Sequence, residues 1–209
     1  MTTFKYGEHI IVLGKPGAGK TYFIKNAILP VYGRHIIIDT EEREFDSNIW
    51  PEVSIDDSIK LINSNQEFKR SIKFPVGERG FAMMEEYSFS LLNTSGNTAI
   101  YFDEVTDFCD ARKIGDGLLS LYRKGRHNNI TLIAGTQRPQ LLNKSIYTNS
   151  IHKFWFFVDE YDIQNWKAYT PYIEEHIGQI PYRSYKCIYE RPDGSLQVLK
   201  PVKEYKWVK

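Results

Sequence analysis

Short apolar runs alternate along the chain with longer stretches in which apolar residues recur at helical spacing. The runs are rich in β-branched and aromatic residues, which favours strands. Several are apolar throughout, as expected for central parallel strands that helices cover on both faces. The pattern therefore predicts an α/β fold with a mostly parallel central sheet. The predicted strands are residues 9–13, 35–39, 71–74, 98–103, 130–135 and 152–158.

The stretches between these runs predict helices. Pro171 lies inside the last stretch, where it removes a backbone hydrogen bond, so a kink or a break is expected there. Near the C-terminus, two β-prone runs flank Pro192-Asp193-Gly194, a strong signal for a hairpin at about residues 182–203. The predicted helices are residues 20–27, 55–62, 80–92, 117–126 and 163–176.

Length and composition limit the organisation of the chain. Its 209 residues are enough for one domain and few for two, so we expect a single domain with a core at about residues 7–178 followed by the hairpin. No run approaches the roughly 20 apolar residues that cross a bilayer. The net charge of +1 argues against a surface that grips nucleic acid everywhere, so any such contact is expected to be local.

Cysteine and histidine residues give no sign of a metal or disulfide framework. Cys109 and Cys187 are the only cysteines, and the five histidines are widely spread with no pair at helical spacing. We therefore expect a reducing, intracellular setting and no zinc chemistry.

The sequence GKPGAGKT matches the P-loop pattern G-x-x-x-x-G-K-[ST] in full. It follows the apolar run HIIVL and begins a predicted helix, which is the context that this pattern requires. Backbone N–H groups would surround the phosphates, Lys20 would reach the β- and γ-phosphates, and Thr21 would bind Mg²⁺. The alternatives are a plain glycine turn and a degenerate loop that binds without hydrolysis. The predicted nucleotide-binding residues are Gly14, Lys15, Pro16, Gly17, Ala18, Gly19, Lys20 and Thr21.

Two carboxylates, Asp103 and Glu104, end the predicted strand 98–103. Open α/β sheets bind ligands at the carboxyl edge, so these side chains are expected beside the P-loop. Asp103 would hold the Mg²⁺ shell, and Glu104 would polarise the attacking water as general base. Such pairs often merely face solvent, but together with a full P-loop this one predicts Mg²⁺-dependent ATP hydrolysis.

Residues 121–162, LYRKGRHNNITLIAGTQRPQLLNKSIYTNSIHKFWFFVDEYD, resemble the HerA/FtsK superfamily of DNA-pumping ATPases. The resemblance implies a RecA-like fold of the ASCE class, in which Gln137 senses the γ-phosphate from a strand between the P-loop and Asp-Glu strands. It also implies that Arg126 is an arginine finger acting on a neighbouring subunit's nucleotide, and hence a ring. Arg123 and Arg79 are the alternative fingers, and a basic helix end is the structural alternative.

The resemblance covers most of the chain, including a second strand that ends in Asp39 with Glu41 following. We expect only a motor core and a hairpin, an organisation that resembles the genome-packaging ATPases of tailless icosahedral viruses with an internal membrane, including turreted archaeal viruses. It implies a ring of five or six subunits that packages double-stranded DNA into a preformed capsid, beside a capsid or membrane protein, in the host cytoplasm or the virion.

Other functions stay open at this point. A filamentous-phage assembly ATPase resembling zonula occludens toxin and a plasmid or conjugation motor are related alternatives. A nucleotide-dependent switch or adaptor belongs to another class. No base-reading motif distinguishes ATP from GTP.

Sequence-independent pumping requires contacts with DNA phosphates rather than bases. Three segments could supply them as loops: EEREF after the second strand, EFKRSIKF, and GER. The alternative is that these charges simply face solvent. The candidate DNA contacts are Lys69, Arg70, Lys73 and Arg79.

Overall fold

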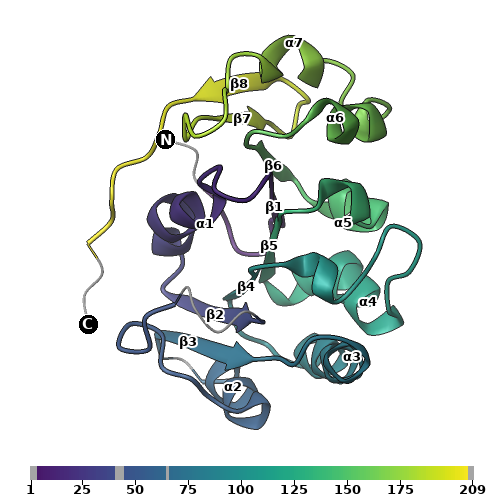
Figure 1. The fold of residues 1–209 in the computed structure, drawn as a ribbon. Coiled ribbons are helices and arrows are strands. Elements are labelled where there is room, and N and C mark those ends of the chain that lie inside the picture. Colours follow the sequence, from purple (N-terminus) through teal and green to yellow (C-terminus); the bar gives the residue numbers. More distant parts are fainter. Residues whose placement is uncertain (1–3, 41–44, 65, 207–209) are drawn as a thin grey trace.

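The computed structural model describes residues 4–40, 45–64 and 66–206 (Figure 1). An eight-stranded sheet runs through the molecule in the order β3-β2-β4-β5-β1-β6-β7-β8. Neighbouring strands from β3 to β6 are parallel, while β7 and β8 continue the sheet in antiparallel fashion. The predicted α/β fold is confirmed. The strands are β1 (Ile10–Leu13), β2 (Arg34–Asp39), β3 (Phe68–Lys73), β4 (Thr98–Phe102), β5 (Ile130–Thr136), β6 (His152–Trp155), β7 (Cys187–Glu190) and β8 (Leu196–Leu199).

Helices cover both faces of the sheet, but unequally. The α1 segment lies on one side, and α3, α4 and α5 lie on the other (Figure 1). After its first turn, α1 continues as a π-helical turn and then as a 3₁₀ turn that contains Pro30. The helices are α1 (Lys20–Phe23), α2 (Ile55–Ile62), α3 (Glu78–Leu92), α4 (Asp116–Lys124), α5 (Lys144–Asn149), α6 (Glu160–Trp166) and α7 (Ile173–Ile177).

Strand β1 shows why the central runs are apolar throughout. Ile11 and Leu13 pack into the core under α2 to α6, whereas Ile10 and Val12 pack into the core under α1. All four side chains are fully buried. Because both faces of the strand are covered, no position along it favours a polar residue.

At the element boundaries, one sequence prediction is wrong and another is confirmed. The stretch that contains Lys69 and Arg70 was expected to be a loop, and this is wrong, because β3 already begins at Phe68. An edge strand that is only half-buried tolerates polar residues, so the apolar pattern marked only its second half. The break expected at Pro171 is confirmed, since α6 and α7 are separate helices.

The C-terminal hairpin is part of the main sheet. Its turn is closed by the Arg191 N–H, which donates to the Ser195 carbonyl over 2.9 Å. The buried Glu190 carboxylate of β7 accepts hydrogen bonds from the Tyr147 hydroxyl at 2.6 Å and from Lys153 Nζ at 3.1 Å. Strand β7 is thereby bonded to both α5 and β6. Among the described helices, none combines the length and apolar character that a bilayer span requires.

Candidate nucleotide-binding and hydrolysis site

The P-loop leaves the carboxyl end of β1 and enters α1. Gly14, Gly17 and Gly19 all have positive φ angles, of 154°, 73° and 104°. A Cβ atom on Gly14 would lie 2.7 Å from the Cβ of Phe156. Residues with a side chain rarely adopt such angles, so this path requires glycine, which lets the backbone N–H groups turn toward one centre.

Lys20 and Thr21 begin α1 at the mouth of a cavity of about 400 Å³. The Lys20 side chain is buried and folds across the loop, where its Nζ donates to the Lys15 carbonyl over 3.0 Å. The described residues that line this cavity are Pro16, Gly17, Gly19, Lys20, Thr21, Tyr22, Gln137 and Tyr185.

The two carboxylates follow β4, at the same sheet edge as the P-loop. Both Asp103 and Glu104 are buried, and the Tyr101 hydroxyl donates a hydrogen bond to Asp103 Oδ1. Strand β5 alone separates β4 from β1, so the carboxylates lie one strand away from the P-loop strand. The expected placement of the pair at this edge is confirmed.

Glu104 is held by the end of β5. Its carboxylate accepts hydrogen bonds from the Thr136 hydroxyl at 2.6 Å and from the Gln137 N–H at 2.7 Å. The Thr106 hydroxyl donates a third hydrogen bond. The side chain is therefore directed from β4 to the end of β5, the strand that lies between β4 and the P-loop strand. Sequence reasoning missed Thr106 and Thr136, although Thr136 is the first residue of the TQRP sequence.

Gln137 lies where the sequence placed it. It follows β5, between the P-loop strand and the carboxylate strand, and lines the P-loop cavity. Its backbone N–H donates to Glu104, and the residue lines the cavity. This position suits contact with a terminal phosphate, a role that stays a prediction.

Arg126 lies at the other edge of the sheet. It belongs to a 3₁₀ turn (η4, Gly125–Asn128) that immediately precedes β5, so it lies at the amino ends of the parallel strands. Arg123, in the last turn of α4, shares this edge, and both side chains are exposed. Within one chain, Arg126 is therefore not brought to the P-loop. Arg79 is exposed in the first turn of α3, which follows the carboxyl end of β3.

The basic residues proposed to contact DNA lie far along the sheet from the P-loop. Lys69 and Arg70 lie within β3, the outermost strand at its end of the sheet. Lys73 ends that strand and forms an ion pair with Glu52, with 3.5 Å between Nζ and Oε2. Glu41 and the first four residues of the EEREF segment, 41–44, lie outside the described residues.

The second P-loop residue is anchored to α6, a contact that the sequence did not reveal. Lys15 Nζ lies 2.6 Å from Asp159 Oδ2 and 3.4 Å from Asp162 Oδ2. The Asp162 side chain is 0% exposed, and burial raises its pKa, whereas the hydrogen bond from Lys15 lowers the pKa of Asp159. This pairing links the P-loop to the helix that follows β6.

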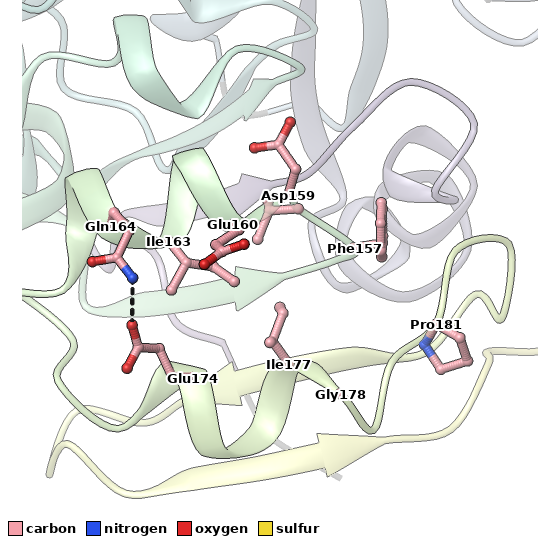
Figure 2. Close-up of a pocket in the computed structure, with 10 residues that line it drawn as sticks. Phe157, Asp159, Glu160, Ile163, Gln164, Glu174, Ile177, Gly178 and Pro181 are labelled. Atoms are coloured by element: carbon pink, nitrogen blue, oxygen red, sulfur yellow. Dashed lines mark hydrogen bonds between the residues drawn. The ribbon is translucent and has the colours of Figure 1, made fainter.

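A second cavity, of about 520 Å³, lies between the segment after β6 and the helices α6 and α7 (Figure 2). A hydrogen bond of 3.0 Å from Gln164 to Glu174 joins the two helices beside it (Figure 2). Among the described residues that line it, the charged ones are all acidic: Asp159, Glu160 and Glu174. Because these carboxylates would repel a triphosphate, the smaller P-loop cavity is the candidate nucleotide site.

Comparison with solved structures identifies the fold. The genome packaging NTPase B204 from Sulfolobus turreted icosahedral virus 2, in complex with AMPPCP, has a TM-score of 0.76 and 19% identity, and the match covers 97% of this chain and 100% of that one. The pCW3 conjugation coupling protein TcpA has a TM-score of 0.57 and 13% identity, with 93% and 60% covered. EssC (ATPases 2 and 3) from Geobacillus thermodenitrificans has a TM-score of 0.54 and 14% identity, with 96% and 41% covered.

These matches confirm the P-loop ATPase fold and the predicted resemblance to the packaging ATPases of turreted archaeal viruses. No curated protein sequence matches the chain. The profile of the family described as the poxvirus A32 protein matches residues 4–176, which is most of the chain. The chain therefore belongs to the poxvirus A32 protein family.

Proposed function

We propose that the protein is an ATP-hydrolysing motor subunit that packages double-stranded viral DNA into a preformed capsid. The observation that carries this proposal is the meeting of the P-loop, the Asp103-Glu104 pair and Gln137 at one sheet edge. A switch or adaptor needs only to bind nucleotide, whereas a buried carboxylate held toward the P-loop strand suits hydrolysis. The fold shared with a genome packaging NTPase supports genome packaging as the proposed function.

Each residue at this edge has a role in the proposed reaction. The P-loop N–H groups and Lys20 bind the β- and γ-phosphates, and Glu104 orients the attacking water and accepts its proton. Thr21 and Asp103 supply the hydroxyl and carboxylate oxygens that Mg²⁺ prefers, and both lie at this edge of the sheet. The ion, when bound, neutralises charge on the phosphates.

The position of Arg126 supports a ring. Because this arginine is exposed at the sheet edge opposite its own P-loop, it could reach only a nucleotide held by another subunit. An arginine finger contributes roughly 10³–10⁵ to the rate in the enzymes where it has been dissected. We propose a ring of five or six subunits in which each Arg126 completes the neighbouring site.

The ring would grip duplex DNA through its phosphates, independently of sequence. Lys69, Arg70, Lys73 and Arg79 are the candidate contacts, and a capsid or membrane protein at the packaging vertex is the candidate docking partner. The protein would act in the host cytoplasm or on the virion.

Steady-state ATP hydrolysis with and without duplex DNA tests the proposal. We expect DNA to stimulate hydrolysis in the wild type. Lys20→Ala should abolish activity, because the phosphates lose their main cation. Glu104→Gln should lower kcat by about 10²–10⁴-fold, the typical contribution of a general base, while nucleotide binding is retained. Unchanged hydrolysis in Glu104→Gln would contradict the proposed mechanism.

A further inference from the structure

Two tyrosines from the segment that joins α7 to β7 lie against the P-loop. The Tyr182 hydroxyl donates to the Pro16 carbonyl over 3.1 Å. A Cβ atom on Gly17 would lie 3.0 Å from that hydroxyl oxygen, and one on Gly19 would lie 2.6 Å from Cδ1 of Tyr185. These rings therefore touch the P-loop backbone where it has no side chains.

The segment has a defined and unusual backbone. Arg183 and Tyr185 have φ angles of 58° and 55°, in the left-handed region that residues with a side chain rarely adopt. The Tyr182 ring packs on Phe157 with 5.3 Å between ring centroids, and the Arg183 guanidinium lies 5.3 Å from the Tyr182 ring. Surrounding contacts thus hold a conformation that is unfavourable in itself and that directs Tyr185 to the P-loop.

Tyr185 lines the P-loop cavity together with Tyr22, the residue that follows Thr21 on α1. These residues are 51% (Tyr185) and 46% (Tyr22) exposed. Exposed aromatic area beside a polar phosphate site offers a flat partner a surface on which to stack.

We propose that Tyr22 and Tyr185 form the nucleobase subsite of this protein. The inference rests on the proposed function, since it requires the triphosphate to occupy the P-loop. The nucleoside must then occupy the remainder of the same cavity. Among the described residues that line it, only Tyr22, Gln137 and Tyr185 lie outside the P-loop motif, and Gln137 lies at the β5 end, beside Glu104. The base is therefore placed on the tyrosines.

This subsite has a consequence for specificity. Strong discrimination between bases requires a site built to hydrogen-bond one of them, because the wrong base then leaves buried polar groups unpaired. The faces of the tyrosine rings would stack on any purine, because all purines offer a similar stacking area, and they supply no hydrogen-bonding groups that distinguish one purine from another. We expect kcat/KM for ATP and GTP to agree within about tenfold, and pyrimidine nucleotides, which stack over a smaller area, to be used less well.

Isothermal titration calorimetry with Mg²⁺-ATP and with Mg²⁺-tripolyphosphate, which lacks a base, tests the subsite. Tyr185→Ala should raise the Kd for ATP by roughly five- to a hundredfold, and leave the Kd for tripolyphosphate unchanged. Tyr185→Phe keeps the ring and should bind both ligands as the wild type does. Tyr22→Leu, on the opposite element, should repeat the selective loss of ATP affinity and serves as the test if Tyr185→Ala does not fold.

The outcomes separate this inference from the proposed function. If Tyr185→Ala and Tyr22→Leu bind ATP as the wild type does, or lose ATP and tripolyphosphate affinity equally, the tyrosines do not hold the base and the inference is overturned. If the wild type binds neither ligand, the P-loop assignment itself fails. A kcat/KM ratio between ATP and GTP far above tenfold would overturn recognition by stacking alone.

Discussion

The hydroxyl of Thr136 provides a direct test of how Glu104 is positioned. It donates to the Glu104 carboxylate over 2.6 Å, and both side chains are buried. Thr136→Val keeps the size and branching of the side chain and removes the hydroxyl, which donates to Glu104 and accepts the Arg138 N–H over 3.0 Å. The Gln137 N–H, at 2.7 Å, still binds the carboxylate, so Glu104 loses one restraint and remains in place on average.

The structure sets the size of the expected effect. A hydrogen bond to a charged group contributes about 1.5–3 kcal/mol. Because another strong donor remains, we take the lower value, about 1.5 kcal/mol, which corresponds to a fall in kcat of about tenfold if the bond orients the general base. Thr136 is not among the residues that line the nucleotide cavity, so KM should stay the same.

Steady-state ATP hydrolysis at several ATP concentrations measures both constants. Thr136→Ser retains the hydroxyl and should retain most of the activity, and thermal denaturation of each variant checks that the fold is kept. An unchanged kcat in Thr136→Val would show that the hydrogen bond does not orient the base. A raised kcat would show that the bond holds Glu104 in an inactive position, which is the opposite of our reasoning.

Three further predictions follow from other parts of the structure. Gly135→Ala would place a Cβ atom 2.6 Å from the Asp103 carbonyl oxygen, and should lower the free energy of unfolding by about 1–3 kcal/mol. Urea denaturation measures this change. Gly178→Ala is the control and should leave the free energy of unfolding unchanged, because the space around Gly178 is open. Inactive Arg126→Ala and Glu104→Gln subunits should regain part of the ATPase activity when mixed, because the first supplies the intact site and the second the finger. Normal activity of Arg126→Ala alone would refute the assignment of Arg126 as the trans-acting finger. Burial lowers the pKa of His9 from 6.5 to about 4, because it disfavours the charged imidazole. The folded state is therefore most stable above pH 6.5, and it loses stability as the pH falls toward 4, where the unfolded chain binds the proton more readily. At pH 5.5 the loss should be on the order of 1 kcal/mol, and it should be absent from the His9→Gln variant.

The core of the fold was predictable because the central strands are apolar throughout. The buried runs that became β1, β4 and β5 need no polar position, and their carboxyl ends necessarily share one edge. The boundaries of β3 and α1 were less predictable. An edge strand accepts Lys69 and Arg70. Apolar spacing does not distinguish the α-helical first turn of α1 from the π-helical turn and the Pro30-containing 3₁₀ turn that follow it.

The candidate site was likewise predictable only in part. The P-loop and the Asp103-Glu104 pair are local motifs, so the sequence reveals them directly. The hydrogen bonds of Thr136 to Glu104 and of Tyr182 to Pro16 join residues 32 and 166 positions apart. No periodicity or spacing encodes such contacts, since they arise only when the strands and the C-terminal segment meet at one edge.

ATP-driven movement along duplex DNA is the central claim, and displacement of a third strand from linear duplex DNA measures it most directly. A fluorescent oligonucleotide bound as a triplex at one end of the duplex is released when a motor reaches it. We predict release by the wild type with Mg²⁺-ATP, and none with ATP-γ-S or with the Glu104→Gln variant. Vigorous DNA-stimulated hydrolysis without release, or equal release without hydrolysis, would contradict the account.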